Sequence, residues 1–323
     1  MDKVVKEVSQ EIREVADRLT SNVGKVIVGK KETVELVLVA LLCEGHVLIE
    51  DVPGIGKTML AKAVARSLGC RFKRIQCTPD LLPSDVTGIH YFNQKSSEFE
   101  FRPGPIMANI VLVDEINRAT PRTQSCLLEC MQEQQVTVDL ETVPLPRPFL
   151  IIATQNPIEL EGTFPLPEAQ LDRFLLRVSL GYPAEDDEGE ILSRFQQENP
   201  LDSLNSVVGA GELLEIQKLC RQVYADSSIR SYAVAIARAT RSHKDIRLGA
   251  SPRASLGLHL ASQALAAIRG RDYVIPDDVK YLAVPALAHR LIAKTEAHLR
   301  GRSVEEIVGE IVSTVSVPVE EQQ

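Results

Sequence analysis

A short glycine-rich stretch holds the residues of this chain that are best suited to chemistry. Residues 47–58 read VLIEDVPGIGKT, an apolar run that enters a tight turn and ends in Gly56, Lys57 and Thr58, and a helix-forming segment follows. Backbone N–H groups at the start of a helix are unpaired and the helix dipole is positive there, so a triphosphate binds readily. Lys57 would reach its β and γ phosphates and Thr58 would hold Mg²⁺, which makes ATP or GTP the implied ligand.

The loop departs from the general phosphate-loop pattern at its first position. That pattern begins with glycine, whereas this chain has Asp51. A carboxylate beside a polyanion is unfavourable, so we expect Asp51 to face outward and the turn after it to bind the phosphates. The alternative is an ordinary glycine turn with a solvated lysine, which the strand before it and the helix after it disfavour. The predicted nucleotide contacts are Pro53, Gly54, Ile55, Gly56, Lys57, Thr58 and Met59.

Two acidic residues follow the apolar run NIVLV. Residues 109–113 predict a buried strand that delivers Asp114 and Glu115 at its carboxyl end, where parallel sheets bind their ligands. Asp114 would contact Mg²⁺, directly or through water, and Glu115 would be the general base that polarises the attacking water. The alternative is a pair of exposed acids at a strand end, and the phosphate loop upstream argues against it.

A polar segment follows the apolar run PFLIIAT at 148–154. Asn156 lies just past the end of this predicted strand, where it would orient the attacking water or the γ-phosphate. The alternative is that Thr154, Gln155 and Asn156 form only a polar turn before Pro157. We prefer the functional interpretation, which places Asn156 between the strands that end in acidic residues.

Two arginines are further candidates. Arg173 stands beside Asp172 in EAQLDRF, where an ion pair within the chain is the simpler interpretation. Arg253 falls in the first turn of a helix that Ser251 would cap. A cation there opposes the helix dipole, so we expect Arg253 to face a bound anion, although a surface arginine could tolerate the small cost.

Five apolar runs in the first half predict strands. Their hydrophobicity is continuous rather than alternating, which fits strands covered by helices on both faces of a parallel sheet. Two further segments, 86–102 and 135–148, have the pattern of β-hairpins. The five runs are VLIE at 47–50, RFKRIQC at 71–77, NIVLVDE at 109–115, PFLIIAT at 148–154 and FLLRVSL at 174–180.

Only helical patterns follow Gly181-Tyr182-Pro183. We therefore predict an α/β core over residues 1–183, which includes amphipathic N-terminal helices, and an all-helical lid over residues 184–323. Pro285 should kink or split the last long helix, and residues 314–323 should fray.

Composition restricts the partners and the compartment. The net charge of −8 and the pI near 5.4 argue against nonspecific binding of nucleic acid by the whole surface, although a local basic patch stays open. No apolar run approaches the roughly 20 residues needed to cross a bilayer, and the N-terminus is too charged for a signal peptide. We expect a cytoplasmic protein without membrane insertion. The six scattered cysteines lack metal-ligand spacing, which predicts free thiols.

Six motifs in one consistent order resemble the AAA+ ATPases, and more narrowly the MoxR family. They are IVG at 27–29, PGIGKT at 53–58, VLVDEINRA at 111–119, ATQNP at 153–157, EAQLDRF at 168–174 and GASPRA at 249–254. The resemblance covers about residues 5–310, and the family tolerates an acid at position 51. It implies a P-loop NTPase core with a five-stranded parallel sheet and two β-hairpin insertions, followed by an all-helical lid.

The resemblance also implies roles by position. Val28 and Gly29 would lie against the adenine. Asn156 matches the first sensor, and Arg253 matches the second, which would read the γ-phosphate from the lid above Lys57. Arg173 matches the arginine finger, which acts in the site of a neighbouring subunit and so requires a homo-oligomeric ring, usually a hexamer. Hydrolysis would release the bridge between core and lid, and the lid would turn about residues 181–183.

The expectation is an Mg²⁺-dependent ATPase that converts ATP and water to ADP and phosphate. By resemblance, it would drive chaperone-like remodelling, maturation or metal or cofactor insertion in partners, often proteins with von Willebrand factor A domains. One alternative is a nucleotide-gated scaffold with little turnover, against which Glu115 argues. A DNA-associated motor is disfavoured by the acidic charge balance. A small-molecule kinase ranks last, because it does not call for paired acids, an arginine finger and a helical lid together.

Overall fold

Five parallel strands form the central sheet, in the order β2-β5-β8-β1-β9. A computed structural model describes residues 2–139, 141–158, 162–196 and 199–318 of the chain, so part of the C-terminal stretch expected to fray lies outside the described residues. All five predicted strands are confirmed, and so is the parallel sheet. Their bounds are β1 Val47–Glu50, β2 Phe72–Gln76, β5 Ile110–Asp114, β8 Leu150–Gln155 and β9 Leu176–Val178.

Successive side chains of a central strand enter two different hydrophobic clusters. On β5, Ile110 and Leu112 pack into the cluster that also contains the N-terminal and lid helices, whereas Val111 and Val113 pack into the cluster on the other face. Side chains alternate between the faces of a sheet, so a strand that is buried on both faces needs apolar residues at every position. This requirement explains why the inner strands β1, β5 and β8 read as continuous apolar runs, whereas the edge strand β2 carries exposed charges.

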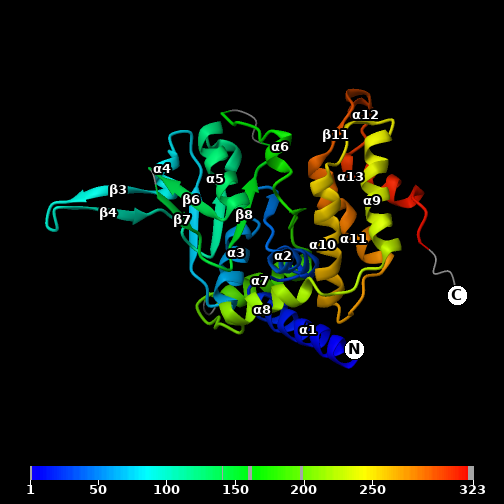
Figure 1. Cartoon of the computed structure of the whole chain (residues 1–323), viewed down its shortest axis with the longest axis horizontal. Helices are drawn as coiled ribbons and strands as arrows, with labels where there is room; N and C mark the ends of the chain where they lie inside the picture. Colours follow the sequence, from blue (N-terminus) through cyan, green and yellow to red (C-terminus); the bar gives the residue numbers. More distant parts are fainter. Residues whose placement is uncertain (1, 140, 159–161, 197–198, 319–323) are drawn as a thin grey trace.

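Helices surround the sheet and continue into a second body. In Figure 1 the sheet and its helices occupy the left part of the molecule, and α9 to α13 stand on the right. The helices of the first half are α1 Asp2–Gly24, α2 Lys31–Leu42, α3 Lys57–Ser67, α4 Pro83–Thr87, η1 Ile116–Arg118, α5 Pro121–Glu133 and α6 Glu168–Leu171. Those of the second half are α7 Glu185–Phe195, α8 Ala210–Cys220, α9 Ser227–Ser242, α10 Pro252–Ile268, α11 Pro276–Leu287, η2 Ala288–Arg290, α12 Thr295–Leu299 and α13 Val304–Thr314.

Both predicted hairpins are confirmed. Strands β3 Gly88–Asn93 and β4 Glu98–Pro103 pair antiparallel and project far from the core (Figure 1), and β6 Gln135–Val138 pairs with β7 Glu141–Pro144. The projecting hairpin exposes two aromatic rings, Phe92 and Phe99, whose centroids lie 5.4 Å apart. His90 of β3 joins the two hairpins, because its Nδ1 lies 2.9 Å from Oδ2 of Asp139. The hairpins therefore form one connected projection.

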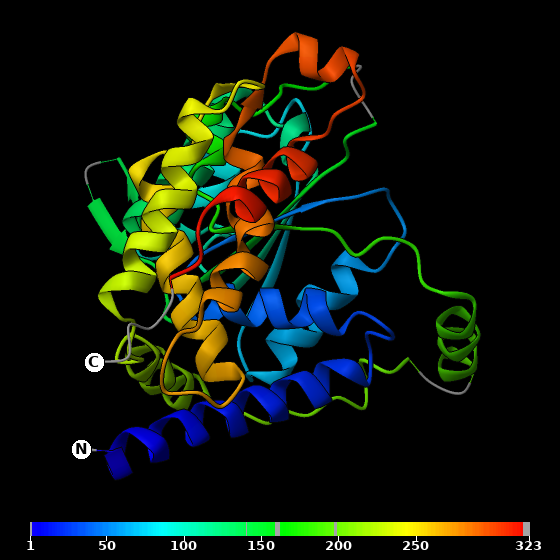
Figure 2. The same cartoon turned by 90° about the vertical axis from the view of Figure 1, so that its right-hand side faces the viewer.

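The helices after residue 183 do not all belong to the lid. Helix α7 lies apart from the lid helices (Figure 2), and Arg194 at its end donates to the carbonyl of Gly24 at the end of α1 (2.8 Å). Helix α8 packs on α2, where Gln217 Nε2 donates to the carbonyl of Leu41 (2.7 Å). The first helices of the second half thus pack on the N-terminal helices, and the boundary at 183 stays a prediction.

The lid departs from the sequence prediction in two details. A short antiparallel pair, β10 Ile246–Leu248 with β11 Ile292–Ala293, lies among its helices, so the lid is not purely helical. Helix α11 includes Pro285 and ends just beyond it, at Leu287, where η2 continues the chain. Because Pro285 falls in the last turn, it ends the helix rather than splitting it.

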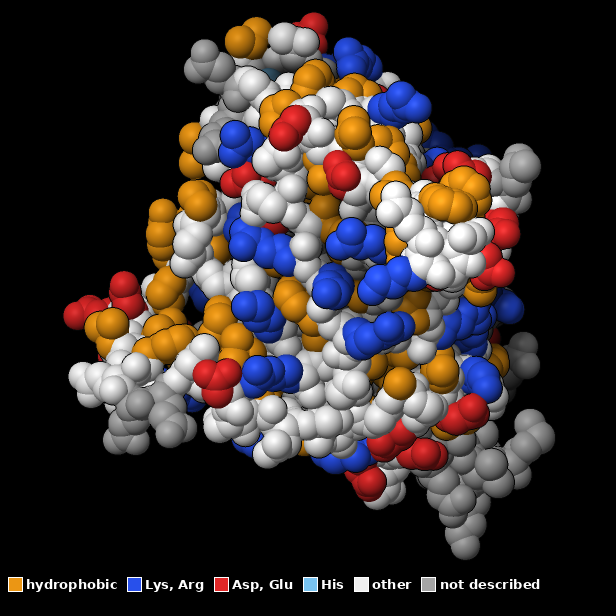
Figure 3. Space-filling view, turned by 90° about the vertical axis from the view of Figure 1, so that its left-hand side faces the viewer, with side chains coloured by type: hydrophobic (Ala, Val, Ile, Leu, Met, Phe, Trp, Pro, Cys, Tyr) orange, Lys and Arg blue, Asp and Glu red, His pale blue; other side chains and the backbone are white. Residues whose placement is uncertain are grey.

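The surface carries a local basic patch despite the acidic net charge. Figure 3 shows Lys and Arg side chains gathered near the centre of the face on the side where the β3–β4 hairpin projects in Figure 1. The edge strand β2 carries exposed charges at Lys73 and Arg74, and charges at an open sheet edge hinder its pairing with another chain. Within the described residues, no helix is both long enough and apolar enough to span a membrane.

Candidate nucleotide site

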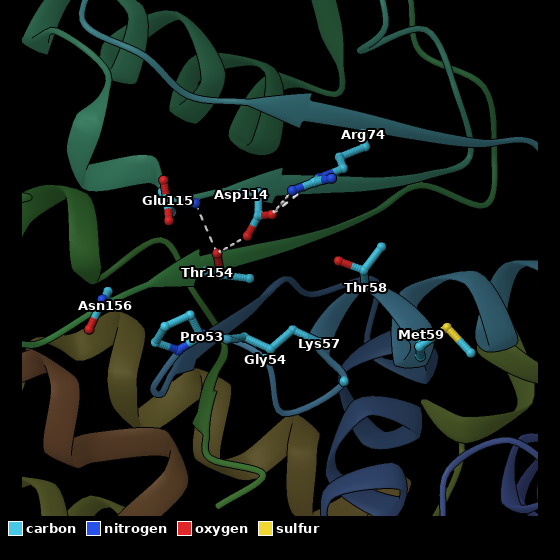
Figure 4. Close-up of a pocket in the computed structure, with 11 residues that line it drawn as sticks. Pro53, Gly54, Lys57, Thr58, Met59, Arg74, Asp114, Glu115, Thr154 and Asn156 are labelled. Carbon is cyan, nitrogen blue, oxygen red and sulfur yellow. Dashed lines mark hydrogen bonds and ion pairs between the residues drawn. The ribbon is translucent and has the colours of Figure 1, made fainter. Parts of the chain in front are cut away.

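One cavity of about 350 Å³ gathers most of the residues singled out from the sequence. Lys57 and Thr58 open α3, Asp114 ends β5, and Asn156 follows β8, so three neighbouring elements meet there (Figure 4). The phosphate loop and the acidic pair therefore face one another across one space. The lining consists of Pro53, Gly54, Gly56, Lys57, Thr58, Met59, Arg74, Asp114, Glu115, Thr154 and Asn156.

The loop has the backbone conformation that its glycines permit. Gly54 and Gly56 have φ of 87° and 95°, in the left-handed region that other residues rarely adopt, and Gly56 precedes the first residue of α3. No side chain caps this helix, so its first N–H groups are open to an anion in the cavity. Ile55 is the exception among the predicted contacts, because it packs against the hydrophobic core instead of lining the cavity.

Val28 and Gly29, the expected adenine contacts, lie outside the cavity lining. Val28 is buried, and Gly29 is exposed with φ of 72°. A Cβ atom at position 29 would lie 2.0 Å from Oδ2 of Asp187, so that side chain would have to move, and the positive φ of Gly29 itself disfavours other residues. Their part in adenine binding stays a prediction.

Lys57 is held in place by its own loop. Its Nζ donates to the backbone carbonyl of Asp51 at 2.6 Å. Partial burial lowers the pKa of Lys57, and the nearby carboxylates of Asp51, Asp114 and Glu115 oppose that effect. The partly buried ammonium group of Lys57 is fixed beside the open start of α3 and is therefore well placed to bind a polyphosphate.

The expectation that Asp51 faces outward is wrong. Its side chain is buried, and Oδ2 accepts hydrogen bonds from Ser179 Oγ (2.8 Å) and from the backbone N–H of Leu180 (2.7 Å) and Gly181 (2.8 Å). These donors compensate the buried charge of Asp51. The sequence could not reveal this pairing, because the donors lie about 130 positions further along the chain. Asp51 is also absent from the lining of the phosphate cavity.

Thr154 joins the two acids. Its hydroxyl donates to Oδ1 of Asp114 at 2.6 Å and accepts from the backbone N–H of Glu115 at 2.9 Å. Glu115 itself has φ of 56°, a strained backbone conformation for a residue with a side chain. The hydroxyl at the end of β8 therefore fixes the turn that separates Asp114 from Glu115. Sequence reasoning treated Thr154 only as part of a polar turn and missed this role.

Strand β2 adds two polar side chains that were also missed. Arg74 donates to Oδ2 of Asp114 through Nη2 (2.5 Å) and Nε (3.1 Å), and Gln76 Nε2 donates to Oε2 of Glu115 at 3.2 Å. Arg118 reaches the same Glu115 oxygen at 3.1 Å. The available signal was strand register, because β2 pairs with β5 and Gln76 stands directly opposite Asp114. Polar residues at the carboxyl end of a neighbouring strand belong to the same site.

The donor set at this edge fits magnesium. Thr58 contributes a hydroxyl and Asp114 a carboxylate to the same cavity, and Mg²⁺ prefers oxygen ligands of these kinds together with phosphate and water. Arg74 shares one Asp114 oxygen, so a metal ion there would compete with a cation already paired with it.

Asn156 fits both interpretations of its segment. It lines the phosphate cavity, as the functional interpretation requires. Its side-chain oxygen also accepts from the backbone N–H of Ile158 (3.1 Å), as in a polar turn. The turn thus fixes the side chain that faces the cavity.

Arg173 and Arg253 line a second cavity, of about 220 Å³, which we call the arginine cavity. Arg253 does not line the phosphate cavity, and its expected place above Lys57 of its own chain stays a prediction. Within the described residues neither arginine makes an ion pair, so the suggested pairing of Arg173 with Asp172 is not found either. Two cations are left available at one face of the molecule.

Asp172 is instead bound to the lid. Its two carboxylate oxygens each accept from Ser251 Oγ at 3.0 Å, and Oδ1 lies 3.5 Å from Nη1 of Arg290. Ser251 caps α10 as predicted, since its Oγ accepts from the N–H of Ala254. Burial lowers the pKa of Arg290 to about 10, with Asp172 opposing the shift and Arg253 adding to it. Arg290 also donates to the carbonyl of Phe174 at 2.6 Å, which fastens the lid to the core beside Arg173.

Known families match this chain in the same two parts. The model of the ATPase family associated with various cellular activities (AAA) matches residues 46–176, and the model of the AAA lid domain matches residues 238–311. A crystal structure of a candidate ATPase from Cytophaga hutchinsonii superposes with a TM-score of 0.91 at 39% identity, covering 98% of this chain and 99% of that one.

Curated relatives are similar over nearly their full length. The "Uncharacterized protein YeaC" of Bacillus subtilis is 51% identical, covering 96% of this chain and 97% of that protein. "Chaperone MoxR1" of Mycobacterium tuberculosis is 42% identical, covering 94% of this chain and 82% of that protein. With the loop, the acidic strand end and the lid in one molecule, these matches show that the chain belongs to the MoxR family of AAA+ ATPases.

Proposed function

We propose that this protein hydrolyses ATP to ADP and phosphate in the cavity lined by Lys57, Thr58, Asp114 and Glu115. The observation that supports this most is the convergence of these side chains from separate elements on one space. A protein that only bound nucleotide would need the phosphate loop but not a carboxylate like that of Glu115, fixed opposite it.

Each side chain has a defined task in this proposal. Lys57 binds the β and γ phosphates beside the open start of α3. Glu115 takes the proton of the attacking water, and Asn156 positions that water. Thr58 and Asp114 would hold Mg²⁺, which would neutralise charge that develops on the phosphates.

The direct test is phosphate release by the purified full-length chain with ATP and Mg²⁺. Glu115→Gln keeps the size and polarity of the side chain but removes the base, so turnover should fall by about 10²-fold or more while ADP binding persists. Lys57→Ala should lose ADP binding as well. A wild type that binds ADP but releases no more phosphate than Glu115→Gln, with little turnover in both, would instead favour the nucleotide-gated scaffold.

We further propose that the protein works as a homo-oligomeric ring, most simply a hexamer. Arg173 and Arg253 line a cavity separate from the one that holds their own Lys57, which suits cations that act on a neighbour's nucleotide. Particle mass with and without ATP, measured on Glu115→Gln so that ATP persists, tests this. A monomer at every protein concentration and nucleotide condition would contradict it.

The work of the ring, in this proposal, is chaperone-like remodelling of partner proteins, including von Willebrand factor A domain proteins and clients that receive a metal or cofactor. A relative carries the name Chaperone MoxR1. The projecting hairpin exposes Phe92 and Phe99, an apolar surface of the kind that binds unfolded segments. ATP-dependent suppression of the aggregation of a heat-unfolded protein tests this idea, with Phe99→Ser as the variant that should keep ATP turnover but lose suppression.

A further inference from the structure

Asp51 occupies the first position of the phosphate loop without lining the phosphate cavity. Its φ is negative, so the backbone at this position has no need of glycine. The side chain is buried, and an isolated carboxylate would be costly there. Something other than phosphate binding accounts for a charge in this place.

The carboxylate of Asp51 binds the segment where the chain leaves the core. Oδ2 accepts from Ser179 Oγ and from the N–H groups of Leu180 and Gly181, all between 2.7 and 2.8 Å. Oδ1 accepts from the N–H of Val52 at 3.1 Å. Hydrogen bonds to an ionised acceptor are about twice as strong as neutral ones, so this junction is well fastened.

The backbone of Asp51 binds the catalytic side of the molecule. Its carbonyl accepts from Nζ of Lys57 at 2.6 Å, and its N–H donates to the carbonyl of Gln155 at 3.2 Å, next to Asn156. A single residue thus contacts the phosphate-binding lysine, the end of β8 and residues 179–181.

Residues 179–181 are themselves suited to transmit a movement. Gly181 has φ of 61°, and as a glycine it has access to more backbone conformations than any other residue, with nothing within 4 Å of where a Cβ would lie. The neighbouring residues are held by α2 and the residue that precedes it, since Thr33 Oγ1 donates to the carbonyl of Ser179 (3.0 Å) and Lys30 Nζ donates to the carbonyl of Tyr182 (2.7 Å). A displacement of the phosphate loop would therefore be transmitted through Asp51 to residues 179–181, which include one glycine.

We propose that Asp51 is a positioning residue that couples the occupancy of the phosphate loop to the conformation of residues 179–181. The proposal rests on the proposed ATPase function, because nucleotide is the ligand whose binding the loop reports. Lys57 exchanges part of its bond to the Asp51 carbonyl for phosphate when nucleotide binds, and the carboxylate transfers the resulting shift to the junction.

Hydrogen exchange of the Leu180 and Gly181 amides in the full-length chain, with and without ADP, tests the coupling. The wild type should exchange these amides at measurably different rates in the two conditions. Asp51→Asn should speed their exchange by about tenfold without ADP, because the charged acceptor is lost, and should abolish the response to ADP. Ser179→Ala removes one of the three donors on Oδ2 and is the matched control, which should keep the response.

Kinetics distinguish positioning from simple repulsion. If Asp51 acted only as a negative charge near the phosphates, Asp51→Asn would bind ADP more tightly and keep the exchange response, and this result would overturn the proposal. Positioning predicts a lower kcat with weaker or equal ADP binding and no response. If Asp51→Asn does not fold, Asp51→Glu decides, because it keeps the carboxylate on a longer side chain. Positioning predicts that Asp51→Glu protects the Leu180 and Gly181 amides from exchange but does not show the wild-type response to ADP. Recovery of both the protection and the response would contradict positioning. A wild type that binds no ADP would reject the ATPase proposal itself, and this coupling with it.

Discussion

The phosphate cavity and the arginine cavity both gather residues that sequence motifs singled out, but the two cavities are assembled from different parts of the fold. In the phosphate cavity, Lys57 comes shortly after β1 and Asp114 ends β5, and the carboxyl ends of these parallel strands lie at the same edge of one sheet. In the arginine cavity, Arg173 comes from the core and Arg253 from the lid. Their meeting depends on how two bodies pack, which no local pattern specifies.

The two cavities also differ in whether their charged side chains have partners within the chain. The acids of the phosphate cavity are satisfied within the chain by Thr154, Arg74 and Gln76. In the arginine cavity, Arg290 is paired and buried, but Arg173 and Arg253 make no ion pair within the described residues. The acids of the first cavity thus have partners within the chain, whereas the two arginines of the second are available for the contact with a neighbouring subunit that we propose.

The largest expected effect concerns Arg173. Arg173→Ala should lower ATP turnover by about 10³-fold or more while ADP binding is unchanged, since a finger stabilises charge only in the transition state. Mixing Arg173→Ala with Lys57→Ala, each inactive alone, should restore part of the turnover, because an intact phosphate cavity then meets an intact arginine cavity. The readout is phosphate release by the mixture.

The matched control for this experiment uses Arg253. A mixture of Arg173→Ala and Arg253→Ala should stay inactive, because every interface would lack one of two cations from the same face. Recovery in this second mixture would mean that the two arginines serve different sites, and the arginine cavity would then not be one functional unit.

The next effect is on stability and concerns Arg290. Arg290→Met keeps the length of the side chain but removes the buried ion pair with Asp172 and the hydrogen bond to the carbonyl of Phe174, so the free energy of unfolding should fall by roughly 3 kcal/mol. Arg253→Ala, at an exposed position, should change it by less than about 0.5 kcal/mol. Urea denaturation of both variants measures the difference, and equal losses would show that the lid is not fastened through Arg290.

Sequence reasoning succeeded where the causal residues are close in the chain. The five strands, both hairpins and the Ser251 cap follow from local periodicity and turn chemistry. Asp51 was misread because its partners, residues 179–181, are distant in sequence and two of them donate through backbone N–H groups that leave no side-chain signal. Arg74 was missed because a charge on a strand reads as a solvated face until the register with β5 is known.

A smaller effect tests the internal order of the phosphate cavity. Thr154→Val keeps the shape of the side chain but removes the hydroxyl between Asp114 Oδ1 and the N–H of Glu115. We expect kcat to fall roughly tenfold with little change in KM, because the acids would lose their fixed separation while the phosphate loop stays intact. A change confined to KM would show that Thr154 serves nucleotide binding instead.

The smallest effect is a pH dependence that belongs to the arginine cavity. His46 lines it and is fully buried, with Nδ1 accepting from the N–H of Ile151 (3.0 Å) and Nε2 facing the carbonyl of Met131 (3.1 Å). Burial lowers the pKa of His46 to about 4 from its ordinary value of 6.5, and the bond to Met131 only partly opposes this.

Because the folded chain keeps His46 neutral, the unfolded chain binds more protons between pH 6.5 and 4. The free energy of unfolding should therefore fall on acidification through this window, by about 1.4 kcal/mol per pH unit from this residue. His46→Gln should be less stable at neutral pH but lose less stability between pH 6.5 and 5.5, whereas replacement of the exposed His298 by glutamine should leave the wild-type slope. Denaturant titrations at these two pH values measure both slopes. Equal slopes for wild type and His46→Gln would mean that another group causes the loss of stability in acid. His289 would be the next residue to replace, because it is buried beside Arg290 and burial lowers its pKa.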